Sequence, residues 1–251
     1  METLLSSYDL SGFEWALALL CGVLIGMSKT GLSGAGLFVV PVFANIFGGK
    51  PSAGLVLPML IVADIFAVIY YNRHANWKYV LKLLPWAFGG ILIAMFVGKA
   101  ISDTQFRMLI AVIVITGIGL MIYQDTRRKK TSVPDYPWFA ALLGTSGGFS
   151  TMIGNAAGPV MSLYLLSMRL PKNMYIGTGA WFFFIVNLSK VPLHVFVWKT
   201  ITWQSLSFDM LMILPIIAGA VGGFYLVKLI PEKAYRIFIM ASTLASSIAL
   251  F

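Results

Sequence analysis

Long apolar runs separated by short polar segments are the dominant pattern in this sequence. Six of the runs reach the roughly 20 residues that an α-helix needs to cross the hydrocarbon core of a bilayer. They cover residues 51–72, 79–99, 104–124, 173–196, 205–229 and 232–251. This pattern predicts an all-α polytopic membrane protein.

Two further apolar stretches are interrupted near their midpoints by small and polar residues. The first has apolar limbs at 13–27 and 35–48, and the second has limbs at 137–150 and 156–169. Backbone that leaves helical geometry at membrane depth is tolerated only where protein buries it or where it lines a water-filled cavity. We therefore expect each stretch to form a re-entrant hairpin of two half-length helices, with two short full spans as the alternative. Broken helices of this kind commonly mark the binding site of a transporter.

An internal repeat relates the two halves of the chain. At a constant sequence offset, Gly31 corresponds to Gly154 and Asp64 corresponds to Asn187. Each half would hold one hairpin and three spans, and an odd number of crossings makes the second half enter the membrane from the opposite face. We therefore predict two inverted repeats in a single membrane domain. The first repeat is 1–123, the linker is 124–137 and the second repeat is 138–251.

Composition and charge support a membrane location. Apolar residues make up 59% of the chain and charged residues only 11%, against about 25% charged in soluble domains. The net charge of +9 does not indicate nucleic acid, because the basic residues lie in short loops between apolar runs, where they set orientation in the bilayer. A cytoplasmic Arg127–Lys130 segment would place most of the 18 basic residues on that side and the acidic N-terminus outside. We expect a multi-pass protein of the cell (inner) membrane.

Few residues are of the types that metal or cofactor chemistry requires. One cysteine and two histidines leave little for a metal centre, and no G-x-x-x-x-G-K-[ST] phosphate loop is present. We therefore predict no metal, no cofactor and no enzymatic activity. Transport would be coupled to a proton or ion gradient or would proceed by facilitated diffusion, and homo-oligomerisation is compatible with the sequence.

The two interruptions supply the residue types that a small-anion site needs. Half-helices beginning near Gly34 and Ala156 would direct unpaired N–H groups at a shared central space. Close helix packing through small residues is the alternative, and it is our interpretation of Gly22 and Gly26. The predicted substrate-binding residues are Ser28, Lys29, Thr30, Gly31, Ser33, Gly34, Ala35 and Gly36 in the first break and Ser150, Thr151, Gly154, Asn155, Ala156, Ala157 and Gly158 in the second.

Ionisable and amide groups within the apolar runs are candidates for ion coupling or charge pairing, because burying them is costly. Lys29 is either the counter-charge of the anion or a partner of Asp64. Asp64 either couples transport to protons or pairs with Lys29 or Lys190. Asn187, Lys190 and His194 share one helix face by their spacing. His194 could carry protons, although a histidine near a helix end more often meets the membrane interface.

A short string offers a catalytic alternative. Gly144-Thr145-Ser146-Gly147, with His194 on a later helix, resembles the Ser–His dyad of rhomboid intramembrane proteases. A nucleophile and its base are identified by their geometry rather than by a sequence string. A protease dyad in the second half would also leave the matching break in the first half unexplained. A protease using Ser146 and His194 and an anion channel are therefore alternatives to a transporter.

The glycine-rich motifs carry a family resemblance. The first, with Gly26, Gly31, Gly34, Gly36 and Pro41, resembles the opening of the sulfite/sulfonate exporter family, known as TauE/SafE or the toluene sulfonate uptake permease family. The second, Gly154-Asn155-Ala156-Ala157-Gly158-Pro159, is similar to that family's second motif. Adjacent glycines are common in the first motif of the family, whereas this chain has Ser33-Gly34-Ala35-Gly36. The resemblance implies transport of sulfite or organosulfonates such as sulfoacetate, whereas the residues by themselves indicate only a small anion.

Overall fold

A computed structural model describes residues 10–32, 35–106, 108, 109, 112, 136–231 and 234. The regular elements among these residues are all helical. Five helices are long and apolar enough to cross a membrane, which confirms the predicted polytopic membrane protein. They are α2 (Gly12–Lys29), α4 (Gly49–Tyr71) continued by the 3₁₀ turn η2 (Asn72–His74), α5 (Trp77–Ala100), α9 (Lys172–Pro192) continued by the π-helical turn η3 (Leu193–Val197), and α10 (Trp203–Leu229).

Helices α4, α5, α9 with η3, and α10 correspond to four of the six predicted spans. The predicted spans 104–124 and 232–251 lie largely outside the described residues, as does the linker 124–137. The remaining elements belong to the two interrupted stretches. They are η1 (Ala35–Phe38), α3 (Val39–Phe47), α7 (Pro137–Gly154) and α8 (Gly158–Ser167).

The limbs of the interrupted stretches differ in length from the prediction. Near-equal limbs were expected, but α2 and α7 have 18 residues each, whereas α3 has 9 and α8 has 10. The second break follows from local chemistry. Asn155 ends α7 in the left-handed conformation, with φ of 55° and its N–H donated back to the carbonyls of Ser150 and Thr151. Pro159 then lies in the first turn of α8, where no backbone donor is needed.

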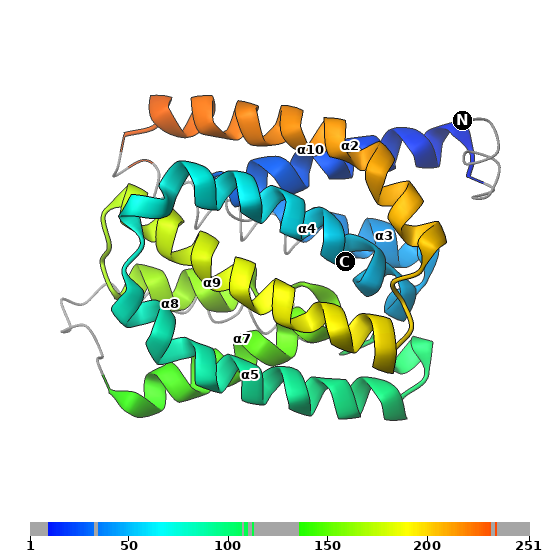
Figure 1. Cartoon of the computed structure of the whole chain (residues 1–251), viewed down its shortest axis with the longest axis horizontal. Coiled ribbons are helices and arrows are strands. Elements are labelled where there is room, and N and C mark those ends of the chain that lie inside the picture. The colour runs from blue at the N-terminus through cyan, green and yellow to red at the C-terminus, as the bar shows by residue number, and fades with distance from the viewer. Residues whose placement is uncertain are drawn as a thin grey trace.

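Each interrupted stretch returns to the end of the molecule from which it started. Trp15 near the start of α2 and Phe47 at the end of α3 both pack on Phe208 of α10. Phe139 near the start of α7 stacks on Tyr164 near the end of α8. Figure 1 shows that the α2–α3 and α7–α8 stretches open toward opposite ends of the molecule.

Helices α2 and α10 form one closely packed parallel pair, and α5 and α7 form another. Gly26 lies against the backbone of α10 between Ile216 and Ala220, and Gly148 lies against the Ala87 carbonyl of α5. A side chain at either glycine would overlap this facing backbone, so small residues are required for the approach. The interpretation of Gly26 as a packing residue is therefore correct. Helices α4 and α9 contact each other and lie between the two pairs (Figure 1).

Candidate functional site

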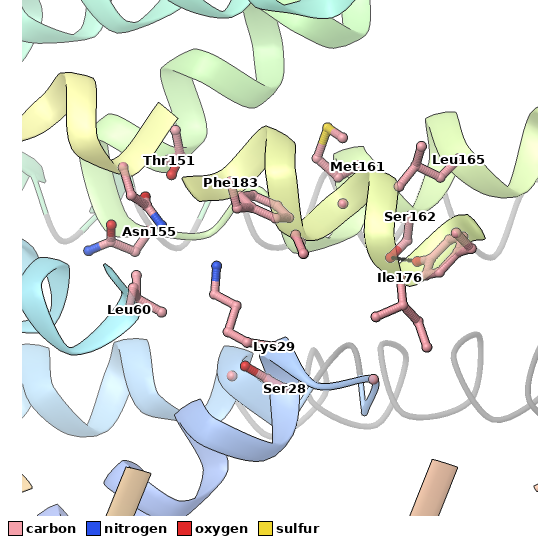
Figure 2. A pocket seen from close by; sticks show the side chains of 17 residues that line it. Ser28, Lys29, Leu60, Thr151, Asn155, Met161, Ser162, Leu165, Ile176 and Phe183 are labelled. Carbon is pink, nitrogen blue, oxygen red and sulfur yellow. Dashed lines mark hydrogen bonds between the residues drawn. The ribbon is translucent and has the colours of Figure 1, made fainter. Parts of the chain in front are cut away.

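A cavity of about 100 Å³ lies between the two breaks. Residues from both interrupted stretches form its wall together with residues of α4 and α9 (Figure 2). Among the described lining residues, Lys29 is the only charged one. The lining consists of Ser28, Lys29, Gly31, Gly36, Leu60, Thr151, Asn155, Gly158, Met161, Ser162, Leu165, Tyr175, Ile176, Gly179, Ala180, Phe183 and Asn187.

Lys29, the last residue of α2, points into this space. Its Nζ lies 2.9 Å from Oδ1 of Asp64 on α4 and 4.2 Å from the centroid of the Phe183 ring. The Lys29 side chain keeps 12% of its surface exposed, whereas Asp64 is fully buried. Asp64 Oδ2 accepts a 2.6 Å hydrogen bond from Asn187 Nδ2. The expected pairing of Lys29 with Asp64 is therefore observed, and because Lys29 also faces the cavity, its role as the counter-charge of an anion stays a prediction.

Lys190 lies on α9 beside the second break and is fully buried. Its Nζ donates to the Thr151 carbonyl and the Thr151 hydroxyl at 3.0 Å each, and to Asn155 Oδ1 at 2.7 Å. An ammonium has three N–H donors, and these three neutral oxygens match them. Asn155 Nδ2 donates to the Ala53 carbonyl at 3.0 Å. The Asn155 side chain thus ties the second break to α4 and α9.

The predicted substrate-binding residues divide into two groups. The hydroxyl of Thr30 donates to the Gly26 carbonyl at 3.0 Å, and that of Ser150 donates to the Ser146 carbonyl at 2.7 Å, so both bond to the backbone of their own helices. Ser33 and Gly34 lie outside the described residues. Those that line the cavity are Ser28, Lys29, Gly31, Gly36, Thr151, Asn155 and Gly158. Those that do not are Thr30, Ala35, Ser150, Gly154, Ala156 and Ala157.

His194 is separate from the cavity. It lies in η3, where it is fully buried, and the expectation that it meets the membrane interface stays a prediction. Its Nδ1 lies 2.8 Å from Oγ1 of Thr200, and its Nε2 has no hydrogen-bond partner among the described residues. Neither ring nitrogen contacts Ser146. The dyad that a serine protease needs is therefore not formed by this pair.

Ser162 and Tyr175 line the cavity but were not predicted from the sequence. Tyr175 Oη donates a 2.9 Å hydrogen bond to Ser162 Oγ, joining α8 to α9. A hydroxyl inside an apolar run usually bonds to the backbone of its own helix. The sequence therefore gives no signal that two such hydroxyls on different helices bond to each other. Helical spacing back from Asn187 through Phe183, Ala180 and Ile176 would have identified the face of α9 that lines the cavity.

These observations define a class of protein. Broken helices that meet at a cavity, in a chain with several membrane-crossing helices, are the architecture of a transporter. Residues 18–250 match the family model described as sulfite exporter TauE/SafE, and the chain therefore belongs to this transporter family. The resemblance noted in the sequence is confirmed. No curated protein and no solved structure matched the chain.

Proposed function

We propose that this chain is a secondary transporter, acting as an exporter, for small sulfur-containing anions such as sulfite or organosulfonates. The observation that carries the proposal is Lys29, a cation that faces a cavity between two broken helices. The anion would contact the Lys29 ammonium while Thr151, Asn155 and Ser28 supply neutral polar groups around it.

Asp64 has a defined part in this proposal. It pairs with Lys29 at 2.9 Å, and an anion in the cavity would compete with it for the same ammonium. Asn187 steadies the second carboxylate oxygen throughout. A carboxylate that is displaced from its cation can take up a proton or pair with another cation, so Asp64 is the group we assign to coupling.

The architecture supports alternating access by two inverted repeats. Asp64 and Asn187 are 123 residues apart, occupy matched repeat positions and contact each other directly, as residues near a two-fold axis must. The pairing of α2 with α10 is matched by that of α7 with α5, and the two hairpins open toward opposite ends (Figure 1). Rocking of these pairs around the cavity would expose the anion to each side in turn.

Basic residues suggest the orientation. Asn76 bonds to Thr178 and Lys172 bonds to the Val227 carbonyl, so the segments around these residues gather at one end of the molecule. This end carries Arg73, Lys78, Lys82, Arg169, Lys172 and Lys228. The positive-inside rule places it in the cytoplasm, with the linker 124–137 on the same side and the N-terminus outside the cell membrane.

Flux into proteoliposomes tests the proposal. Labelled sulfite, sulfoacetate and sulfate are offered to vesicles that contain the full chain, and saturable uptake accelerated by internal substrate is expected for at least one sulfur anion. A channel would give flux without this counterflow acceleration. Absence of flux for every anion contradicts the transporter. Lys99→Met, at an exposed lysine on α5, is the matched control for lysine substitutions.

Side-specific labelling tests alternating access. A cysteine is introduced as Ser28→Cys, in the cavity wall, in a Cys21→Ser background that removes the single natural thiol. Labelling by a membrane-impermeant maleimide is expected from each side, with substrate changing the ratio of the two rates. Labelling from one side only, whatever the substrate, contradicts alternating access.

A further inference from the structure

We infer that the cavity selects organic monoanions that carry a neutral hydrogen-bonding group at the far end of a short apolar chain. This inference rests on the function proposed above and narrows its substrate class. It follows from the balance of buried charge around the cavity and from the chemistry of the cavity wall opposite Lys29.

The first argument is charge balance. Lys29 is the only charged side chain among the described lining residues, so the cavity wall offers a ligand one cation. In a medium of low dielectric an uncompensated charge is expensive. The single negative charge of a monoanion can be met by Lys29, whereas the second charge of a dianion would have no cation in the described lining.

The second argument is the division of polar groups between the two ends of the cavity. Figure 2 shows Lys29 pointing toward the side where Thr151 and Asn155 lie, with Ser162 displaced from them beside Ile176 and Leu165. Phe183 and Met161 lie between these polar groups in Figure 2, and such apolar side chains suit hydrocarbon rather than a second charge. The other large apolar lining residues are Leu60, Leu165 and Ile176.

The far end is polar but neutral. Ser162 accepts the Tyr175 hydroxyl hydrogen at 2.9 Å, and its own hydroxyl hydrogen can still be donated to a ligand. Both residues are almost completely buried, at 3% and 6% exposure. Such a pair can bond a ligand hydroxyl, carbonyl or amide, but it brings no charge to neutralise a second carboxylate or sulfonate. A hydroxyalkanesulfonate is therefore the matching ligand.

A ligand series tests this inference on the purified full chain by calorimetry and thermal unfolding. Ethanesulfonate, 2-hydroxyethanesulfonate, sulfoacetate and sulfate vary the far end and the charge separately. The hydroxylated monoanion is expected to bind about 3- to 10-fold more tightly than ethanesulfonate, the effect of one additional hydrogen bond. The two dianions are expected to bind more weakly than either.

Substitution at the far end shows whether Ser162 is responsible. Ser162→Ala should reduce the ratio of the affinity for 2-hydroxyethanesulfonate to the affinity for ethanesulfonate to about one. The affinity for ethanesulfonate itself should not change. Ser167→Ala is the matched control on α8, because that hydroxyl bonds the Leu163 carbonyl and does not line the cavity. Tyr175→Phe provides a second variant, expected to weaken the same preference.

The outcomes separate this inference from the proposed function. Tighter binding of sulfoacetate or sulfate than of 2-hydroxyethanesulfonate overturns the inference. An equal loss of affinity for every ligand in Ser162→Ala overturns it as well. Saturable sulfite flux without binding of any monoanionic sulfonate also overturns it, although the transporter would stand. Absence of both flux and binding contradicts the proposed function itself.

Discussion

Lys29 and Lys190 place a lysine side chain beside each of the two breaks, and the two differ in their partners. Lys29 pairs with the carboxylate of Asp64 and keeps some exposure to the cavity. Lys190 is fully buried and, among the described residues, bonds to neutral oxygens of Thr151 and Asn155. The first lysine therefore faces the cavity, whereas the second holds the break in shape.

The difference has a simple origin in the sequence. Matched positions of the two halves carry a carboxylate at Asp64 and an amide at Asn187, so only one acidic group is available for two lysines. Only Lys29 therefore has a carboxylate partner. In the proposed function, this difference between the two matched positions leaves Lys29 as the cation that meets the anion.

Lys29→Met should have the largest effect. It leaves the buried Asp64 carboxylate without its cation, a change that typically lowers the free energy of unfolding by about 3–5 kcal/mol. Anion binding should be lost as well. Denaturant unfolding in detergent and proteoliposome flux measure the two effects, with Lys99→Met as the control. Unchanged anion affinity in folded protein would contradict the assigned role.

Combining Lys29→Met with Asp64→Asn separates stability from function. Removal of the carboxylate charge should restore most of the lost stability, because no buried charge is then left unpaired. Flux should not recover, since the cation that faces the cavity is still missing. Recovery of both properties would show that Lys29 serves only to neutralise Asp64.

Lys190→Met should destabilise the protein less than Lys29→Met. It leaves no carboxylate unpaired, but three oxygens of Thr151 and Asn155 lose their donor, which corresponds to about 1–3 kcal/mol. Adding Asp64→Asn should give no rescue. Anion affinity should still fall, because Thr151 and Asn155, which line the cavity, lose the donor that positions them. A greater loss of stability in Lys190→Met than in Lys29→Met would contradict the expectation that Lys29 contributes more to stability.

Asn155 allows a finer test of the second break. Asn155→Gly and Asn155→Ala both remove the side-chain bonds to Lys190 and the Ala53 carbonyl. Only alanine adds the penalty for a left-handed backbone, because φ is 55° at this position. The free energy of unfolding of Asn155→Ala should therefore be about 1 kcal/mol lower than that of Asn155→Gly. Equal stabilities would indicate that the break relaxes to another conformation.

Thr151→Val should have the smallest effect. The substitution removes one of the three acceptors of Lys190 and keeps the shape and the Thr151 carbonyl. A loss of about 0.5–1.5 kcal/mol in the free energy of unfolding is expected. Chemical denaturation measures it, and a loss as large as that of Lys190→Met would show that the hydroxyl is the principal acceptor.

Much of the fold was predictable because its signals are local. Four of the described long helices follow from apolar length alone, and the start of α2 follows from the Ser11 and Glu14 capping box. Limb lengths in the breaks were predicted less well. Helix α7 continues four residues beyond its predicted apolar limb and ends at Gly154, where the left-handed Asn155 stops it.

The sequence by itself determined the membrane helices, the two breaks and the unequal number of acidic and basic groups at depth. These depend on residue type and on spacing along one helix. Only the tertiary structure decided which groups meet. Lys190 reaches Asn155 from 35 positions away, and Tyr175 reaches Ser162 from another helix. Such contacts depend on how helices pack, so the cavity and its polarity could not be obtained from local pattern.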